Sequence, residues 1–232
     1  MTSRKYLFIM LFALSTTLFA QQKAFQFGFK GGVNMGWFST DAQEYNNDGV
    51  DLGGSWGFVA DIFLMDNYSL TTGFDVIYLN SSLSYPDQKS HSVSSEVIEG
   101  MTSSKYKTKY LELPLIFTMR TNQLGKVKYY AQIGLGIGFL LSAKADESFI
   151  SDDGNTQGSE TLNTYEDFRF TRESFIVGAG VEIPIQGSTY IRTGIKFDNA
   201  FINVLKGYNT VDSGLKNHGR NSFIEFNVAL FF

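Results

Sequence analysis

Apolar and polar residues alternate along most of the chain beyond residue 24. In the longest run, 127–141, the odd positions are all apolar, from Val127 to Leu141, whereas the even positions are mostly polar or glycine. A period of two is typical of a β-strand with one apolar face. Seven other segments show the same alternation: 25–37, 56–64, 68–78, 111–120, 174–183, 189–201 and 223–232. The pattern therefore predicts eight strands.

The connections between these segments alternate in length. Short turns at 65–67, 121–126 and 185–188 alternate with long polar stretches at 39–54, 81–105, 144–167 and 203–220. Structureless loops of this length are unusual in compact soluble domains, whereas outer-membrane barrels have long extracellular loops and short periplasmic turns. We therefore expect an all-β fold: an eight-stranded antiparallel transmembrane up-and-down β-barrel of the small OmpA/OmpX type. The last strand should pair with the first, and both termini should be periplasmic.

The composition of the two faces indicates which one points outward. The polar face is rich in glycine and carries five basic and six acidic side chains: Lys30, Asp61, Asp75, Glu112, Arg120, Lys128, Glu182, Arg192, Lys196, Asp198 and Glu225. Glycine weakens exposed strands, but it suits a narrow lumen in which opposite charges pair. The apolar face carries aromatic residues near strand ends, as interfacial girdles do: Phe25, Trp37, Trp56, Tyr68, Tyr78 and Phe232. A soluble lipocalin-like barrel, with its apolar face inward around a ligand, is the alternative.

The first twenty residues have the features of a secretory signal peptide. Arg4 and Lys5 precede the mostly apolar stretch 6–19, and we place cleavage after Ala20. This divides the chain into a signal peptide, 1–20, and a barrel domain, 21–232. No later stretch approaches 18 consecutive apolar residues, which excludes a helical membrane protein.

Charge and cysteine content exclude several classes of protein. The formal net charge is −4 and becomes −6 when Arg4 and Lys5 are removed, so the basic footprint of a nucleic-acid binder is lacking. The chain contains no Cys, which excludes disulfides, a Cys zinc site and a Cys nucleophile.

Short motifs resemble one bacterial family. Residues 110–115, Tyr-Leu-Glu-Leu-Pro-Leu, and residues 29–34, Phe-Lys-Gly-Gly-Val-Asn, resemble segments of the PorT-type outer-membrane β-barrel proteins of Bacteroidetes. The signal ending Phe-Ala-Gln is also similar to that family, and the terminal Phe232 resembles the terminal aromatic residue of bacterial outer-membrane barrels in general. The resemblance implies an outer-membrane barrel and, through the founding member, a link to type IX protein secretion. It implies no functional residues.

Pro114 lies within a predicted strand, although proline cannot donate to a β-ladder. We expect a bulge or a missing ladder bond there, on the lumen side.

Few residues suggest chemistry. His91 lies between Ser90 and Ser92 and near Asp87, and His218 lies in the last long loop; an outer-membrane lipid-modifying enzyme would need such groups at the outer rim. Serine-rich loops produce this arrangement by chance, so we expect no enzyme activity and assign no catalytic residue. Asp152-Asp153-Gly154-Asn155 does not meet the calcium-loop spacing, so we expect no metal or cofactor. Lys107 and Lys109 share the lipid-facing parity and could reach lipopolysaccharide phosphates.

Two function classes follow for a cell outer-membrane protein. One is a structural or interaction barrel whose extracellular loops bind a surface protein partner, and the alternative is a component of protein secretion or transport machinery. In either case eight strands leave an interior only wide enough for side chains. We therefore expect a lumen plugged by ion pairs rather than a conductive path.

Overall fold

The computed structural model describes residues 25–90, 97–154 and 156–232. The described part contains nine strands and one short 3-10 helix, η1 (Tyr165–Asp167). The strands are β1 (Phe25–Ser39), β2 (Asn46–Met65), β3 (Tyr68–Ser90), β4 (Val97–Arg120), β5 (Lys128–Ser151), β6 (Thr156–Asn163), β7 (Thr171–Gln186), β8 (Thr189–Ala200) and β9 (Arg220–Phe231). No helix in these ranges is long and apolar enough to cross a membrane. The proposed signal peptide, 1–20, lies outside the described residues.

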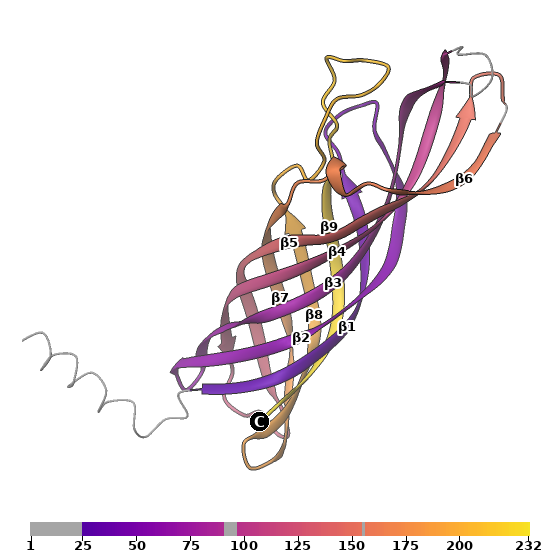
Figure 1. Ribbon diagram of the computed structural model, residues 1–232. Coiled ribbons are helices and arrows are strands. Elements are labelled where there is room, and N and C mark those ends of the chain that lie inside the picture. Colours follow the sequence, from indigo (N-terminus) through magenta and orange to yellow (C-terminus); the bar gives the residue numbers. More distant parts are fainter. Residues whose placement is uncertain (1–24, 91–96, 155) are drawn as a thin grey trace, which may run out of the picture.

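Eight of the strands close into an antiparallel ring (Figure 1). Along the ring β1 to β5 follow one another, then β7, β8 and β9, and β9 pairs with β1 from Gly28–Phe231 to Ser39–Arg220. Closure satisfies the backbone hydrogen bonds that an open edge would leave unpaired in lipid. The predicted pairing of the last strand with the first is confirmed.

The apolar face of the ring points outward. On β5 the side chains of Ile133, Leu135 and Ile137 are 45%, 52% and 47% exposed. Of the predicted girdle residues, Phe25, Trp56, Tyr68, Tyr78 and Phe232 are also exposed, and Trp37 stacks on Phe197 with ring centroids 6.2 Å apart. This arrangement is the reverse of a lipocalin-like barrel, in which the apolar side chains would face the interior.

Two of the predicted long loops are instead largely strand. β3 and β4 stay paired as far as Ser90–Val97, and the outer part of β5 pairs with β6, which lies outside the ring. Together, residues 80–90, 97–108, 143–151 and 156–163 form a sheet that we call the outer blade, which projects beyond the ring (Figure 1). The prediction of structureless loops at 81–105 and 144–167 was therefore wrong. β2 likewise begins at Asn46, inside the predicted loop 39–54. Residues 203–219, in contrast, contain no strand, as expected for a loop.

Pro114 interrupts the ladder without a bulge. In the β3–β4 ladder the pairs Thr72–Leu115 and Asp75–Glu112 share one register, but the residues between them do not pair across these two strands. Pro114 is buried on the lumen side, and its carbonyl accepts a hydrogen bond of 2.9 Å from the hydroxyl of Thr72. The expectation that a ladder bond is missing at Pro114 is thus confirmed, and the hydroxyl of Thr72 replaces part of the lost pairing.

Gly73, opposite this interruption, is required by the backbone. Its φ is 142°, a region that side-chain-bearing residues rarely adopt. A Cβ added at Gly73 would lie 2.0 Å from the carbonyl oxygen of Phe58. Gly31 differs, because the nearest atom to an added Cβ there is 3.9 Å away.

Substituting Gly73→Ala should therefore lower the free energy of unfolding by roughly 1–3 kcal/mol. Urea unfolding in lipid vesicles measures the effect, and Gly31→Ala is the matched control, for which we expect a change within about 0.5 kcal/mol. Equal stability of the two variants would show that neither the backbone conformation nor the close approach at Gly73 constrains the barrel.

Candidate functional site

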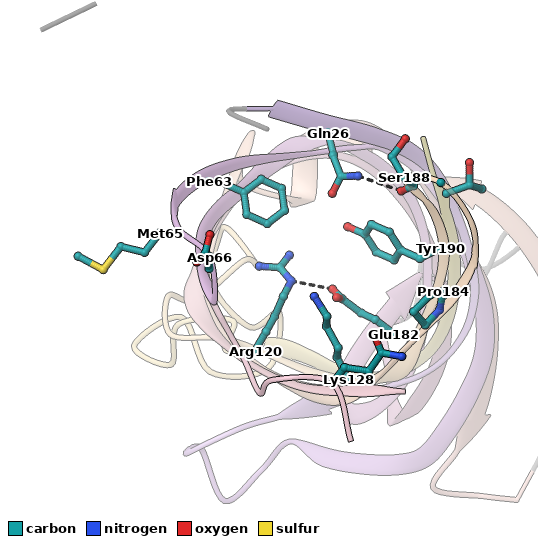
Figure 2. A pocket seen from close by; sticks show the side chains of 13 residues that line it. Gln26, Phe63, Met65, Asp66, Arg120, Lys128, Glu182, Pro184, Ser188 and Tyr190 are labelled. Carbon is teal, nitrogen blue, oxygen red and sulfur yellow. Dashed lines mark hydrogen bonds and ion pairs between the residues drawn. The ribbon is translucent and has the colours of Figure 1, made fainter. Parts of the chain in front are cut away.

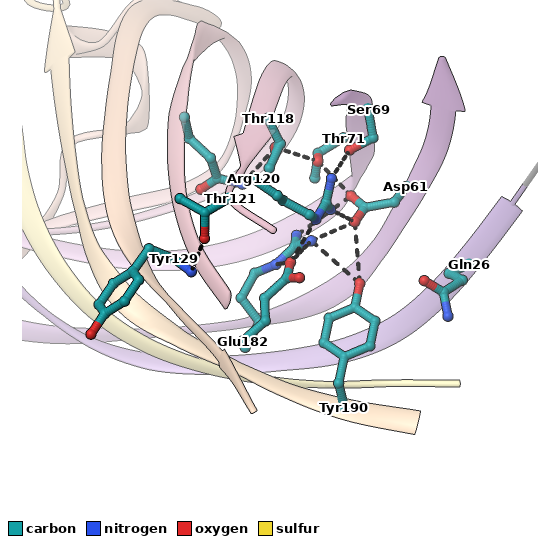
Figure 3. Close-up of polar contacts among 12 residues, drawn as sticks. Gln26, Asp61, Ser69, Thr71, Thr118, Arg120, Thr121, Tyr129, Glu182 and Tyr190 are labelled. Atoms are coloured by element: carbon teal, nitrogen blue, oxygen red, sulfur yellow. Dashed lines mark hydrogen bonds and ion pairs between the residues drawn. The ribbon is translucent and has the colours of Figure 1, made fainter. Parts of the chain in front are cut away.

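The lumen is filled by a layered network of buried ion pairs. In the layer nearest the short turns, the carboxylate of Asp61 pairs with the guanidinium groups of both Arg120 and Arg192 (Figure 3). Glu182 bridges the same two arginines, at 2.9 Å from Arg120 and 2.7 Å from Arg192. The hydroxyl of Tyr190 donates to Asp61 over 3.3 Å. The layer therefore matches two cations with two carboxylates.

Two further layers continue toward the outer blade. Lys30 Nζ lies 2.6 Å from Asp75 and 3.4 Å from Glu225. Lys196 lies 3.5 Å from Glu112 and 3.8 Å from Glu225. In the outermost layer, Arg172 lies 3.2 Å from Glu112 and 2.5 Å from Asp198, and its Nε donates to the side-chain oxygen of Asn221. Charges removed from water in this way need partners, and each cation here has at least one.

The lumen prediction was correct for ten of the eleven charged side chains. Lys128 is the exception: among the described residues it has no carboxylate within 4 Å, and it lines the mouth at the short-turn end. The sequence interpretation missed Arg172, because it began the seventh strand at Ser174. The alternation of the seventh strand does extend to Arg172, because this residue lies at an even position, as the lumen-facing Ser174 and Glu182 do.

A dense apolar layer covers the outermost ion pairs. It contains Phe38, Leu83, Tyr106, Tyr110, Leu140, Phe168, Val204 and Leu205. The β8–β9 connection is held in this layer by backbone hydrogen bonds, from Val204 N to Gly219 O at 2.9 Å and from Arg169 N to Val204 O at 2.7 Å. The charged layers and this apolar cap together separate the two ends of the barrel.

Each end has a cavity of about 330 Å³. At the short-turn end, the side chains of Gln26, Phe63, Arg120, Lys128 and Tyr190 converge on the opening (Figure 2). Arg120 also stacks on Phe63, with its guanidinium carbon 4.9 Å from the ring centroid. This cavity ends at the Asp61 layer.

The cavity at the other end, which we call the outer cavity, has aromatic and acidic walls. It is lined by Tyr45, Tyr85, Asp87, Tyr106, Glu147, Asp167, Leu205, Lys206, Gly207, Tyr208, Asn209, Thr210 and Asn217. Tyr45 and Tyr85 stack with ring centroids 5.4 Å apart. Burial raises the pKa of Tyr106 to about 12 and also raises the pKa values of Tyr45 and Tyr85, so these phenols are neutral hydrogen-bonding groups. Sequence patterning did not find this cavity, because its walls come from six separate segments.

Lysines lie on the outward face of the blade, directly beyond the apolar band. Lys107 pairs with Asp146, and this hydrogen bond is the main cause of the lowered pKa of Asp146. Lys105 pairs with Asp51. Lys109 Nζ lies 4.8 Å from the ring centroid of Tyr78, and the exposed Lys144 is the cross-strand neighbour of Lys107. Of the two lysines expected at a lipid headgroup, Lys109 therefore has no carboxylate partner among the described residues, whereas Lys107 has one.

Of the residues considered for an enzyme, the structure describes Asp87 and His218 in full. His91 and Ser92, and the side chain of Ser90, lie outside the described residues. Asp87 lies in the outer cavity, where hydroxyls of Thr102 and Thr210 donate to it, while His218 lies beside Asp41, with Nε2 3.8 Å from the carboxylate. Within the described ranges, no group of three or more His, Asp or Glu side chains could hold a metal ion.

A closed eight-stranded ring with an apolar exterior and paired charges inside defines a transmembrane β-barrel of the outer-membrane class. The sequence matches the family described as "Outer membrane protein beta-barrel domain" over residues 19–173, about two thirds of the chain. The chain belongs to this family, which makes it an outer-membrane β-barrel protein.

Solved structures similar to this chain include other small barrels. Neisserial surface protein A is 12% identical, with 90% of this chain and 97% of that chain covered and a TM-score of 0.44. A major outer membrane protein from Thermus thermophilus is 10% identical, with 89% and 99% covered and a TM-score of 0.42. Ail of Yersinia pestis is 12% identical, with 89% and 98% covered and a TM-score of 0.37. A comparison with curated proteins finds no match.

Proposed function

We propose that this protein is a non-conducting outer-membrane barrel whose outer blade and outer cavity form a recognition surface. The observation that carries the proposal is the filled lumen: three layers of paired charges and an apolar cap lie between the two mouths. A channel would need a continuous wet path, and eight strands leave room only for side chains. The structure beyond the ring, by contrast, is extensive and well paired, which suits a binding role.

Planar-bilayer recording tests the absence of conduction. The wild-type protein, inserted from detergent and shown to be folded by heat-modifiable gel migration, should give a current indistinguishable from that of the protein-free bilayer. The reason is that ions would have to displace buried, paired side chains, which is costly. Reproducible current steps at each insertion, of one size, would contradict the proposal and favour a transport role.

A secretion-machinery role is the second candidate, and it rests on the resemblance of residues 29–34 and 110–115 to PorT-type proteins of Bacteroidetes. Export by the signal peptide at 1–20 is part of either proposal. Purification in mild detergent distinguishes the candidates, because co-migrating inner- and outer-membrane subunits of a secretion apparatus would favour the second.

We further propose that lipopolysaccharide phosphates bind the lysines at the base of the blade. Lys109 and Lys144 are the cations there without a carboxylate partner among the described residues, and lysine stems can extend along the apolar surface while the ammonium stays in the headgroup region. Replacing both by Gln should weaken binding of purified lipopolysaccharide by roughly 2 kcal/mol, since each lysine near a charged surface contributes about 1 kcal/mol.

Isothermal titration in detergent measures this affinity. Lys126→Gln is the matched control, because Lys126 is an exposed lysine in the β4–β5 turn at the opposite end of the barrel. The same loss in the control variant would show a generic charge effect and contradict a site at Lys109 and Lys144.

A further inference from the structure

The outer cavity combines aromatic faces with a buried carboxylate that lacks a cation. Asp87 is only 7% exposed. Its Oδ1 accepts from Thr210 Oγ1 at 2.6 Å and from the backbone N–H of Gln88 at 2.9 Å, and its Oδ2 accepts from Thr102 Oγ1 at 2.7 Å. Among the described residues, no Lys, Arg or His nitrogen lies within 4 Å of it, whereas every buried carboxylate of the lumen has such a partner. Asp87 therefore differs from the structural carboxylates of this protein.

The side-chain hydrogen-bond donors of Asn209, Tyr45 and Asn217 at the cavity are already used within the protein. Asn209 donates to the hydroxyl of Tyr45 at 3.2 Å and to the carbonyl of Pro86 at 2.8 Å. Tyr45 donates its own hydroxyl proton to the side chain of Asn217 at 2.7 Å, and Asn217 donates to the carbonyl of Lys206 at 2.8 Å. These interactions leave carboxylate lone pairs and ring faces as the main unused capacity.

The charges that line the cavity also favour a cationic ligand. Three carboxylates line the cavity, those of Asp87, Glu147 and Asp167, against one lysine, Lys206. Glu147 already holds an ammonium group, that of Lys89, at 3.3 Å, and the same Lys89 nitrogen lies 5.6 Å from the ring centroid of Phe149. An ammonium beside a carboxylate and over an aromatic ring is thus an arrangement that the blade already contains.

We propose that the outer cavity binds an alkylammonium group, with Asp87 as its counter-ion and Tyr45 and Tyr85 as its aromatic wall. An ammonium supplies donors and positive charge, which the carboxylate of Asp87 can accept, and it is attracted to the faces of aromatic rings. A neutral polyol fits less well, because it needs protein donors as well as acceptors. The cation can be a free amine or the lysine side chain of a partner protein. This inference rests on the proposed function, in that it names the ligand class of the outward recognition surface.

The experiment uses the full-length protein folded in phosphatidylcholine nanodiscs and isothermal titration. The probes are 1,4-diaminobutane for a free amine, Nα-acetyl-lysine-N-methylamide for a peptide lysine, and 1,4-butanediol as the neutral isostere. Saturable binding of either amine without binding of the diol supports the proposal, and the ratio of the two amine affinities identifies the source. No binding of either amine, or equal binding of the diol, overturns it.

Variants locate the site. Asp87→Asn keeps the shape but removes the charge and should weaken amine binding at least about tenfold. Asp48→Asn is the control, because Asp48 also accepts from two hydroxyls, those of Ser84 and Ser103, but is exposed outside the cavity; we expect a change within about twofold. Equal losses in both variants would overturn the assignment.

Tyr85→Leu tests the site if Asp87→Asn unfolds the blade. It keeps the carboxylate, removes an aromatic face, and should weaken amine binding about threefold or more; unchanged affinity would contradict the aromatic wall. Bilayer recording separates the two proposals: amine binding by a conducting barrel would refute only the sealed lumen, and a silent barrel that binds no amine would refute only the cation site.

Discussion

Replacing Asp61 by asparagine is expected to lower the free energy of unfolding by about 3–5 kcal/mol. The carboxylate is fully buried and pairs with Arg120 and Arg192, whose side chains are 2% and 4% exposed. Asparagine keeps the shape but leaves two guanidinium groups with Glu182 as their only carboxylate in that layer. Removing one partner of a buried ion pair leaves a charge that neither water nor protein compensates.

Urea unfolding in lipid vesicles, followed by tryptophan fluorescence, measures this loss. The double variant Asp61→Asn/Arg192→Gln restores the balance of one cation to one carboxylate, so it should be more stable than the single variant. The paired-layer account of the lumen fails if Asp61→Asn unfolds at the same urea concentration as the wild type. It also fails if the double variant is less stable than Asp61→Asn alone.

Replacing Leu135 by arginine should cost roughly 2–4 kcal/mol. Leu135 is 52% exposed on the apolar face of β5, near the middle of the run that pairs with β4 and β7. A guanidinium on the lipid face at the bilayer midplane cannot reach water without distorting the bilayer, and the penalty is largest at this depth.

The neighbouring substitution Gly136→Ser is the control for strand position. A Cβ at Gly136 would lie 2.7 Å from Ser174 Oγ and 3.1 Å from the carboxyl carbon of Glu112, so the added side chain crowds side-chain atoms of the lumen and not the backbone. We expect a smaller loss than for Leu135→Arg, measured by heat-modifiable gel migration and urea unfolding. Tolerance of arginine at 135 together with rejection of serine at 136 would reverse the assignment of inside and outside.

The ring could be predicted because one side of every strand faces lipid. Between Val127 and Leu141, lipid demands an apolar side chain at every second position, and the narrow lumen holds mostly polar residues or glycine at the others. This requirement repeats in each membrane-crossing segment, so the number of ring strands followed from the period, and their facing followed from the composition of the two faces. Eleven lumen charges followed from the same alternation, and ten of them are paired as expected.

The outer blade could not be predicted in this way because both of its faces carry polar residues. Ser103 and Ser84 on its outward face and Thr102 and Ser104 on its inward face are all small polar residues, so the apolar contrast disappears while the backbone pairing continues. Backbone pairing extends β3 and β4 there as far as Ser90–Val97. The outer cavity was missed for a different reason: Tyr45, Asp87 and Asn209 are far apart in sequence and meet only when the β8–β9 connection folds over the mouth.

Site-specific lipid quenching tests the central claim, that the apolar face of the ring contacts lipid. The chain contains no Cys, so a single cysteine at Leu135, or at Lys107 on the blade, can carry the only fluorescent label. In vesicles, doxyl-labelled lipid should quench the probe at 135 strongly and iodide should not, whereas iodide should quench the probe at 107. Strong iodide quenching at 135 with no effect of the doxyl lipid would contradict the account, because the apolar face would then not lie in the membrane.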